Sequence, residues 1–251
     1  MIPIVSFSHI VTIPFLLFIS FRLFPSFFKT KDKNIGYFFA TFAFLTIMEG
    51  LLASPGLIFK DSIEVGIVFA IYPFFLFLSL SFFAAVSFNI MKWEKTKRIF
   101  LIVMFIIAIS ITIINLINLQ PAVTYQHPPF AYWEDTRGAA VNIFIGILSG
   151  LILMFIVFFY LFNGLKSLER YVRIRSFLIG GGTAGFFFSA IINFVSGSSL
   201  SASKYISSIM ASFVLLLSCI IIFVGVRYKY KKEVEEFPYP KTKETYPKIK
   251  W

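Results

Sequence analysis

Glu49 is a carboxylate inside a long apolar run, in the stretch LTIMEGLLASPG at residues 45–56, and no Lys or Arg lies within ten positions of it. A charged acid at membrane depth costs ~2–3 kcal/mol, so such a residue faces a cavity, pairs or takes up a proton. This predicts a polar ligand-binding pocket centred on Glu49. The alternative is that Ser54-Pro55-Gly56 breaks the helix and lets the carboxylate reach interfacial water or bond locally.

His9 is a second ionisable side chain that is expected at the same depth in the membrane as Glu49. Counted from Ile35 at the inner face, Glu49 lies ~21 Å across, which leaves ~9 Å to the outer edge of a ~30 Å hydrocarbon core. Counted from Ile2 at the outer face, His9 lies ~10 Å below the same edge. We expect the two side chains at one depth on neighbouring helices. Whether they face each other is left open by the sequence.

Further polar residues accompany this pair in the outer half of the predicted bundle. They complete the proposed ligand-binding set with Glu49 and His9, and they are Tyr72, Asn115, Asn118, Asn142 and Asn193. Asn115 and Asn118 are three positions apart, so they share a helix face. For each asparagine taken singly, an interhelical hydrogen bond is the alternative reading.

The elements that carry these residues are long apolar blocks. The chain of 251 residues is 58% hydrophobic, contains 35 Phe and is only 14% charged, against ~25% charged in a soluble domain. The blocks match the ~20 residues that cross a bilayer as helix. The sequence therefore predicts an all-α polytopic membrane protein with seven transmembrane spans, roughly 2–21, 35–58, 63–91, 99–119, 139–163, 176–198 and 204–226.

The basic residues predict the orientation. Twenty Lys and Arg follow spans one, three, five and seven, and only Lys60, Arg137 and Lys204 lie on the other side. By the positive-inside rule the N-terminus faces out and the C-terminus is cytoplasmic. The net charge of +11 then serves orientation and contact with anionic lipids, which makes a nucleic-acid partner unnecessary.

Two domains are expected. Residues 1–226 form the seven-helix membrane domain, and 227–251 form a basic, proline-containing cytoplasmic tail that we expect to be disordered. The long outer segment 119–138 has no helical period and is expected to be a binding loop or an interfacial loop. Gly181 and Gly185, four apart in GGGTAG, predict close helix packing.

The sequence lacks the residues on which known catalytic and cofactor-binding membrane proteins depend. Cys219 is the only cysteine, there are two histidines, and no metal-ligand spacing appears, so neither a metal site nor a cofactor is expected. Lys204 lies too near a helix end for a retinal Schiff base. No serine-protease string and no paired intramembrane aspartates occur. We therefore expect no catalytic residue and no enzyme.

The layout resembles the seven-helix sensor modules that accompany prokaryotic histidine kinases, with LERYVRIRSFLIGGG, an Arg-rich inner turn entering a Gly-rich span, similar in texture. The resemblance implies a receptor-like protein of the cell membrane that binds a small or lipidic ligand. Since the chain carries only a tail after its last span, a separate cytoplasmic or membrane partner would carry the signal. The alternatives are a non-catalytic subunit of a larger membrane complex and a small transporter or channel coupled through Glu49.

Overall fold

Seven helices dominate the computed structural model, which describes all residues except 1, 128–129, 135–137, 197–202 and 237–251. Each is long and apolar enough to cross a membrane, so the prediction of seven long apolar helices is confirmed. The elements in chain order are β1 (Ile2–Pro3), α1 (Ile4–Thr30), α2 (Lys33–Ala53), α3 (Ser62–Ile90), α4 (Glu94–Ile117), β2 (Val123–His127), β3 (Phe130–Glu134), α5 (Ala139–Lys166), α6 (Arg170–Ser196) and α7 (Ser203–Glu236).

Several helix ends differ from the predicted spans. Helix α1 continues past residue 21 to Thr30, because its last turns are apolar enough to extend the helix around Arg22. Helix α2 ends at Ala53 rather than at residue 58, because Pro55 lacks the N–H that a continuing helix needs and Gly56 has φ +76°. Helix α7 runs past the predicted domain boundary at 226 to Glu236. The rest of the predicted tail lies outside the described residues.

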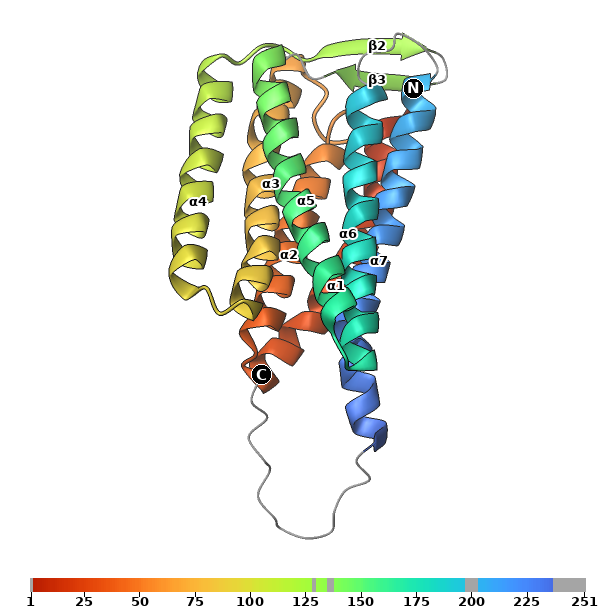
Figure 1. The fold of residues 1–251 in the computed structure, drawn as a ribbon. Helices are drawn as coiled ribbons and strands as arrows, with labels where there is room; N and C mark the ends of the chain where they lie inside the picture. Colours follow the sequence, from red (N-terminus) through yellow and green to blue (C-terminus); the bar gives the residue numbers. More distant parts are fainter. Residues whose placement is uncertain (1, 128–129, 135–137, 197–202, 237–251) are drawn as a thin grey trace.

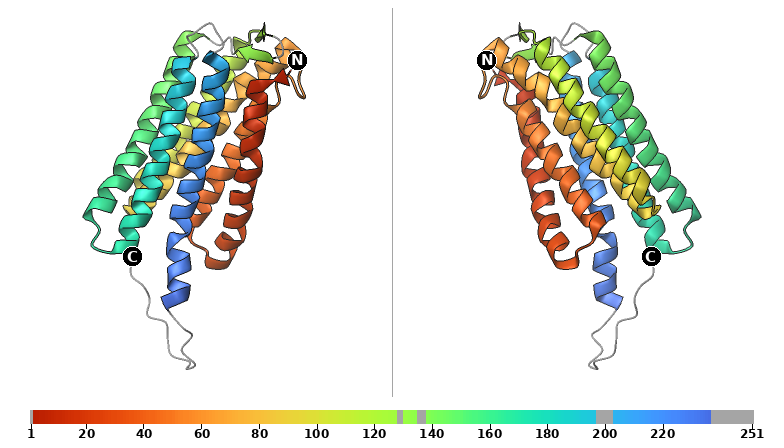
Figure 2. Two further views of the ribbon diagram at one scale, coloured as in Figure 1. Left: turned by 90° about the vertical axis from the view of Figure 1, so that its right-hand side faces the viewer. Right: turned by 90° about the vertical axis from the view of Figure 1, so that its left-hand side faces the viewer.

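Helices α1 to α4 pack in chain order, as do α5 to α7, and α7 closes the arrangement by contacting α1 (Figure 1). Helix α7 packs closely on α6 and also contacts α1, so it lies between them (Figure 2). Helix α3 joins the two halves by packing on α5 as well as on α2 and α4. The core that these contacts enclose is rich in phenylalanine, with Phe38, Phe42 and Phe77 almost fully buried.

Helix α4 is the peripheral member of the bundle. It packs mainly on α3, and its buried residues form one narrow stripe: Lys97, Met104, Ala108, Ile111 and Asn115. Most of its other side chains are exposed isoleucines, valine and phenylalanine. A helix buried on one stripe and apolar elsewhere suits a lipid surround.

A small sheet caps one end of the bundle, in the segment that was predicted to be an irregular loop. Strands β2 and β3 form an antiparallel pair from Val123↔Glu134 to His127↔Phe130, and β1 pairs in parallel with β3. Figure 1 shows this sheet over the ends of the helices. We call this end of the bundle the sheet end, and the opposite end, where α7 finishes, the tail end.

Glycines in α6 allow its close approach to α7. A Cβ on Gly185 would lie 2.4 Å from the Ser218 hydroxyl, and one on Gly182 would lie 2.9 Å from the Ser218 carbonyl oxygen. Gly181, by contrast, has open space around it. The predicted packing face is therefore carried by Gly182 and Gly185 rather than by Gly181 and Gly185, because the contacting face is rotated by one residue.

Candidate functional site: a buried histidine, glutamate and threonine

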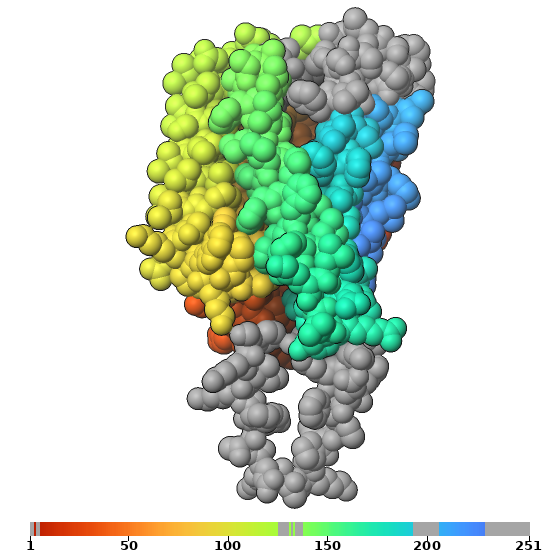
Figure 3. Space-filling view, in the orientation of Figure 1, coloured from red at the N-terminus to blue at the C-terminus, as the bar shows by residue number. Residues whose placement is uncertain are grey.

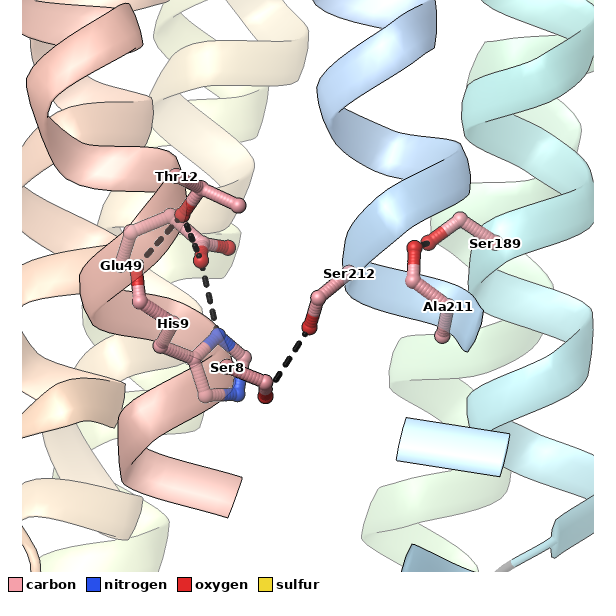
Figure 4. Close-up of polar contacts among 7 residues, drawn as sticks. All are labelled: Ser8, His9, Thr12, Glu49, Ser189, Ala211 and Ser212. Atoms are coloured by element: carbon pink, nitrogen blue, oxygen red, sulfur yellow. Dashed lines mark hydrogen bonds and ion pairs between the residues drawn. The ribbon is translucent and has the colours of Figure 1, made fainter. Parts of the chain in front are cut away.

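Glu49 is almost completely buried, with 1% of its surface exposed. Its Oε2 lies 2.7 Å from His9 Nδ1 and accepts a hydrogen bond of 2.8 Å from the Thr12 hydroxyl. His9 and Thr12 are buried too. These three side chains, which we call the buried trio, join α1 to α2 in the half of the bundle nearer the sheet end (Figure 4). The carboxylate is thus paired, as burial of a charge requires.

The spacing on α1 explains why two partners reach one carboxylate. His9 and Thr12 are three residues apart, which places them on one helix face one turn apart. Both side chains turn toward the same Glu49 oxygen in Figure 4. Thr12 also lies 2.7 Å from the His9 carbonyl oxygen, so its hydroxyl has two acceptors within reach.

The Thr12 hydroxyl has one proton and gives it to one acceptor at a time. When Glu49 is ionised and His9 is protonated, Thr12 donates to the carboxylate. When the proton sits on Glu49 instead, the carboxyl group donates to His9 Nδ1 and Thr12 donates to the His9 carbonyl oxygen. The same heavy-atom positions therefore serve both arrangements, and in each the His9–Glu49 pair is neutral overall, as a low-dielectric interior favours.

A chain of contacts connects the trio to the sheet end. Ser6, one turn before His9, donates a hydrogen bond to the Pro55 carbonyl oxygen just after α2. A Cβ on the neighbouring Gly56 would lie 2.8 Å from the Pro3 ring and 3.0 Å from Trp133 Nε1, so only glycine fits there. Strands β1 and β3 supply Pro3 and Trp133. The sheet therefore sits directly on the turn that follows Glu49.

A second chain of contacts runs from α1 to α7. Ser212 on α7 donates a hydrogen bond of 3.1 Å to the hydroxyl of Ser8. Ser8 is the residue before His9 in the chain. One residue earlier, the Ala211 carbonyl oxygen accepts a 2.7 Å bond from Ser189 on α6 (Figure 4). Hydroxyl groups thus link α1, α7 and α6 at the level of the trio.

The other predicted site residues lie in different surroundings. Asn115 on α4 donates to the Ala70 carbonyl oxygen of α3 at 3.5 Å, and Asn118 is exposed and bonds to Ile114 of its own helix. Tyr72 on α3 and Asn142 near the start of α5 are half-buried. The side chain of Asn193, in α6, lies outside the described residues. Of the predicted set, His9 and Glu49 contact each other, while Asn115 links α4 to α3.

A second polar cluster, at the tail end, was missed as a unit by sequence reasoning. Lys97 of α4 is 3% exposed and bonds to Asn89 of α3 at 2.8 Å and to Glu94 at 2.7 Å. Asn89 in turn donates to Asn34 of α2 at 2.8 Å, and the Lys97 ammonium lies 5.3 Å from the Tyr37 ring centroid. This tail-end network ties α2, α3 and α4 together. Its one sequence signal is Glu94 three positions before Lys97, which marks a shared helix face.

Thr12 was also missed, because a threonine in an apolar helix is usually read as bonding its own backbone. Within the described part of the chain, no three His, Cys, Asp or Glu side chains come together as a metal site would require. The chain matches no protein-family model and no curated protein sequence. The buried trio is therefore the feature on which a functional reading rests.

Proposed function

We propose that this protein is a membrane sensor with receptor-like architecture, in which the buried trio is the element that responds to the stimulus. The sheet end would face the outside of the cell membrane and the tail end the cytoplasm, as the twenty-to-three distribution of basic residues favours. The signal would pass to a separate cytoplasmic or membrane partner.

The observation that carries this proposal is the His9–Glu49 contact of 2.7 Å, buried where α1 meets α2. A second proton, or a small cationic ligand competing for the carboxylate, would leave an unbalanced charge in a low-dielectric interior. The favourable response is for α1 and α2 to separate and admit water. A stimulus that reaches the pair is thereby converted into a movement of helices.

Contacts around the trio indicate where that movement would travel. The sheet rests on the Pro55-Gly56 turn, so a ligand on the sheet would press on the residues that follow Glu49. Ser8 bonds to Ser212, so a displaced α1 would pull on α7. Because α7 extends to Glu236 at the tail end, it is the helix best placed to carry the change to a partner.

The test measures the distance between α1 and α7 at the tail end against external pH, in the full chain reconstituted in vesicles, because this is where the movement is proposed to arrive. Spin labels are placed on the exposed positions Lys29→Cys and Arg227→Cys, in a Cys219→Ser background, and their distance is measured by pulsed electron paramagnetic resonance. The external pH is lowered from about 8 to about 5, and the label distance is expected to change.

Two variants decide whether the trio is responsible for that change. Glu49→Gln keeps the shape and an acceptor for Thr12 but removes the titrating carboxyl, and it is expected to abolish the distance change. Glu64→Gln, at an exposed carboxylate near the same end of the bundle, is the matched control and should retain it. A full response in Glu49→Gln, or none in the parent protein, would contradict the proposal.

A further inference from the structure

The turn between α5 and α6 is held in one conformation by its own hydrogen bonds. The Ser167 N–H donates to the Asn163 carbonyl oxygen at 3.0 Å, and the Arg173 N–H donates to the Glu169 carbonyl oxygen at 3.0 Å. The Arg173 guanidinium reaches back, with Nε and Nη2 donating to the Ser167 carbonyl oxygen at 3.3 and 3.0 Å. We call residues 165–173 the α5–α6 tip.

This ordered tip presents large apolar side chains to its surroundings. Leu168 is 95% exposed and Leu165 is 72% exposed. The tip also carries three exposed basic residues, Lys166, Arg170 and Arg173, and one acid, Glu169. An apolar centre with a basic rim is complementary to a segment that carries aromatic side chains and carboxylates.

The tip projects beyond the neighbouring turn, as Figure 3 shows for the surface at the tail end. The Phe88 and Phe155 rings stack with centroids 5.2 Å apart, which sets α3 and α5 at one level. From there α3 continues for two residues to Ile90 and α5 for eleven to Lys166, so α5 ends about 13 Å beyond α3 at 1.5 Å per residue. Trp93, exposed in the α3–α4 turn, marks headgroup depth for an embedded bundle. The leucines of the tip therefore lie past the headgroups, where lipid does not cover them.

The register of α6 against α7 shows which part of the chain arrives at the tip. Gly225 lies against Leu178 and Ile179, and Gly182 lies against Ser218 and Ile222. Continuing this antiparallel register brings the start of α6 level with the last turn of α7, which ends at Glu236. The last turn of α7 and the residues after it have the sequence EVEEFPY, residues 233–239.

We infer that the acidic and aromatic segment 233–239 is the occupant of this surface, with Phe237 and Tyr239 over Leu165 and Leu168 and its carboxylates toward the basic rim. The segment has three Glu residues, which complement the excess of Lys and Arg on the tip. Its two aromatic rings complement the two exposed leucines. No linker is needed, because the segment begins within the last turn of α7. The inference depends on the helices lying in a membrane but not on the proposed sensing role of the trio.

Disulfide cross-linking in the full chain, reconstituted in vesicles, tests this contact. Cys219→Ser removes the one native thiol, which is buried. The test pair is Leu168→Cys with Phe237→Cys, and the matched control is Leu168→Cys with Ile249→Cys, further along the same tail. Oxidation by copper phenanthroline should link the test pair about tenfold faster than the control, since a held contact raises effective concentration. Adding Arg170→Glu to the test pair should slow its reaction.

Each other outcome has a definite meaning. Equal rates for the two pairs would overturn the inference. Disulfide-linked dimers in place of the internal bond would assign the surface to a second copy. Cross-linking that is lost when phosphatidylcholine vesicles are replaced by vesicles containing phosphatidylserine would assign the tail to the anionic membrane surface. Because the assay involves neither pH nor Glu49, its failure would leave the sensing proposal to its own test.

Discussion

The buried trio and the tail-end network are two polar clusters of opposite design. The trio joins two helices, and both charged members are enclosed, with the Glu49 and His9 side chains 1% and 11% exposed. The tail-end network joins three helices, and its carboxylate, Glu94, is half-exposed while Lys97 is 4% exposed. One cluster is sealed from its surroundings and the other has one charged group in contact with them.

This difference determines what each cluster contributes. A sealed pair has to remain neutral, because removing one partner leaves an uncompensated charge that no water can hydrate. In the open network Glu94 is hydrated, so its pairing with Lys97 contributes little by itself, and the asparagine bonds do most of the linking. The trio therefore depends on both of its partners being present, whereas the network links three helices through hydrogen bonds.

Breaking the sealed pair should give the largest loss of stability. Glu49→Leu leaves His9 buried without its partner, and the unfolding free energy should fall by about 3–5 kcal/mol. Denaturant titration in mixed micelles measures it, with the exposed Glu64→Leu as control. The double variant His9→Leu/Glu49→Leu should lose less than Glu49→Leu alone. A double variant that loses the sum of the two single losses would show that the residues do not act as a pair.

Removing the centre of the tail-end network should have an intermediate effect. Asn89→Leu removes the bonds to both Asn34 and Lys97, and the expected loss is about 1–2 kcal/mol. The same titration measures it, and Asn118→Leu is the control because that exposed side chain bonds only within its own helix. A loss as large as that of Glu49→Leu would remove the distinction between a sealed and an open cluster.

Loss of the hydroxyl in the trio should have the smallest effect. Thr12→Val keeps the shape and leaves the His9–Glu49 contact in place, so we expect about 0.6 kcal/mol, the usual size of one interhelical bond in a membrane. Thr112→Val on α4, where the hydroxyl bonds to its own helix, is the control. If Thr12→Val weakened the protein as much as Glu49→Leu, the pair would have to depend on the hydroxyl.

The helices, and the depth of each residue along them, could be predicted from the sequence. Both follow from the length of an apolar block and the rise per residue. Apolar blocks of bilayer length predict spans, and the rise per residue placed His9 and Glu49 at one level, where the structure pairs them. The direction in which a side chain points is different, since it depends on how each helix is rotated about its axis in the bundle. That is why the pairing itself, and the one-residue shift from Gly181 to Gly182 at the α6–α7 contact, were not predictable.

The features that sequence reasoning missed depend on contacts between distant segments. The segment 119–138 is rich in proline and has no clear alternation, and β3 gains its second partner from Ile2 and Pro3 at the other end of the chain. Lys97 was counted with the basic residues that set orientation, although it is buried against Asn89 of another helix. Sidedness in the membrane stays a prediction that rests on charge alone.

The chain order of these contacts has a consequence for biosynthesis. His9 and Glu49 are separated by 40 positions, so their pair is complete as soon as the second helix has been made. Both members of the pair are then present while the remaining helices are still being made. Strand β1, in contrast, has to wait for residues 130–131 before it is paired. Substitution of Glu49 should therefore lower the yield of inserted protein during synthesis, before the finished bundle exists to be destabilised.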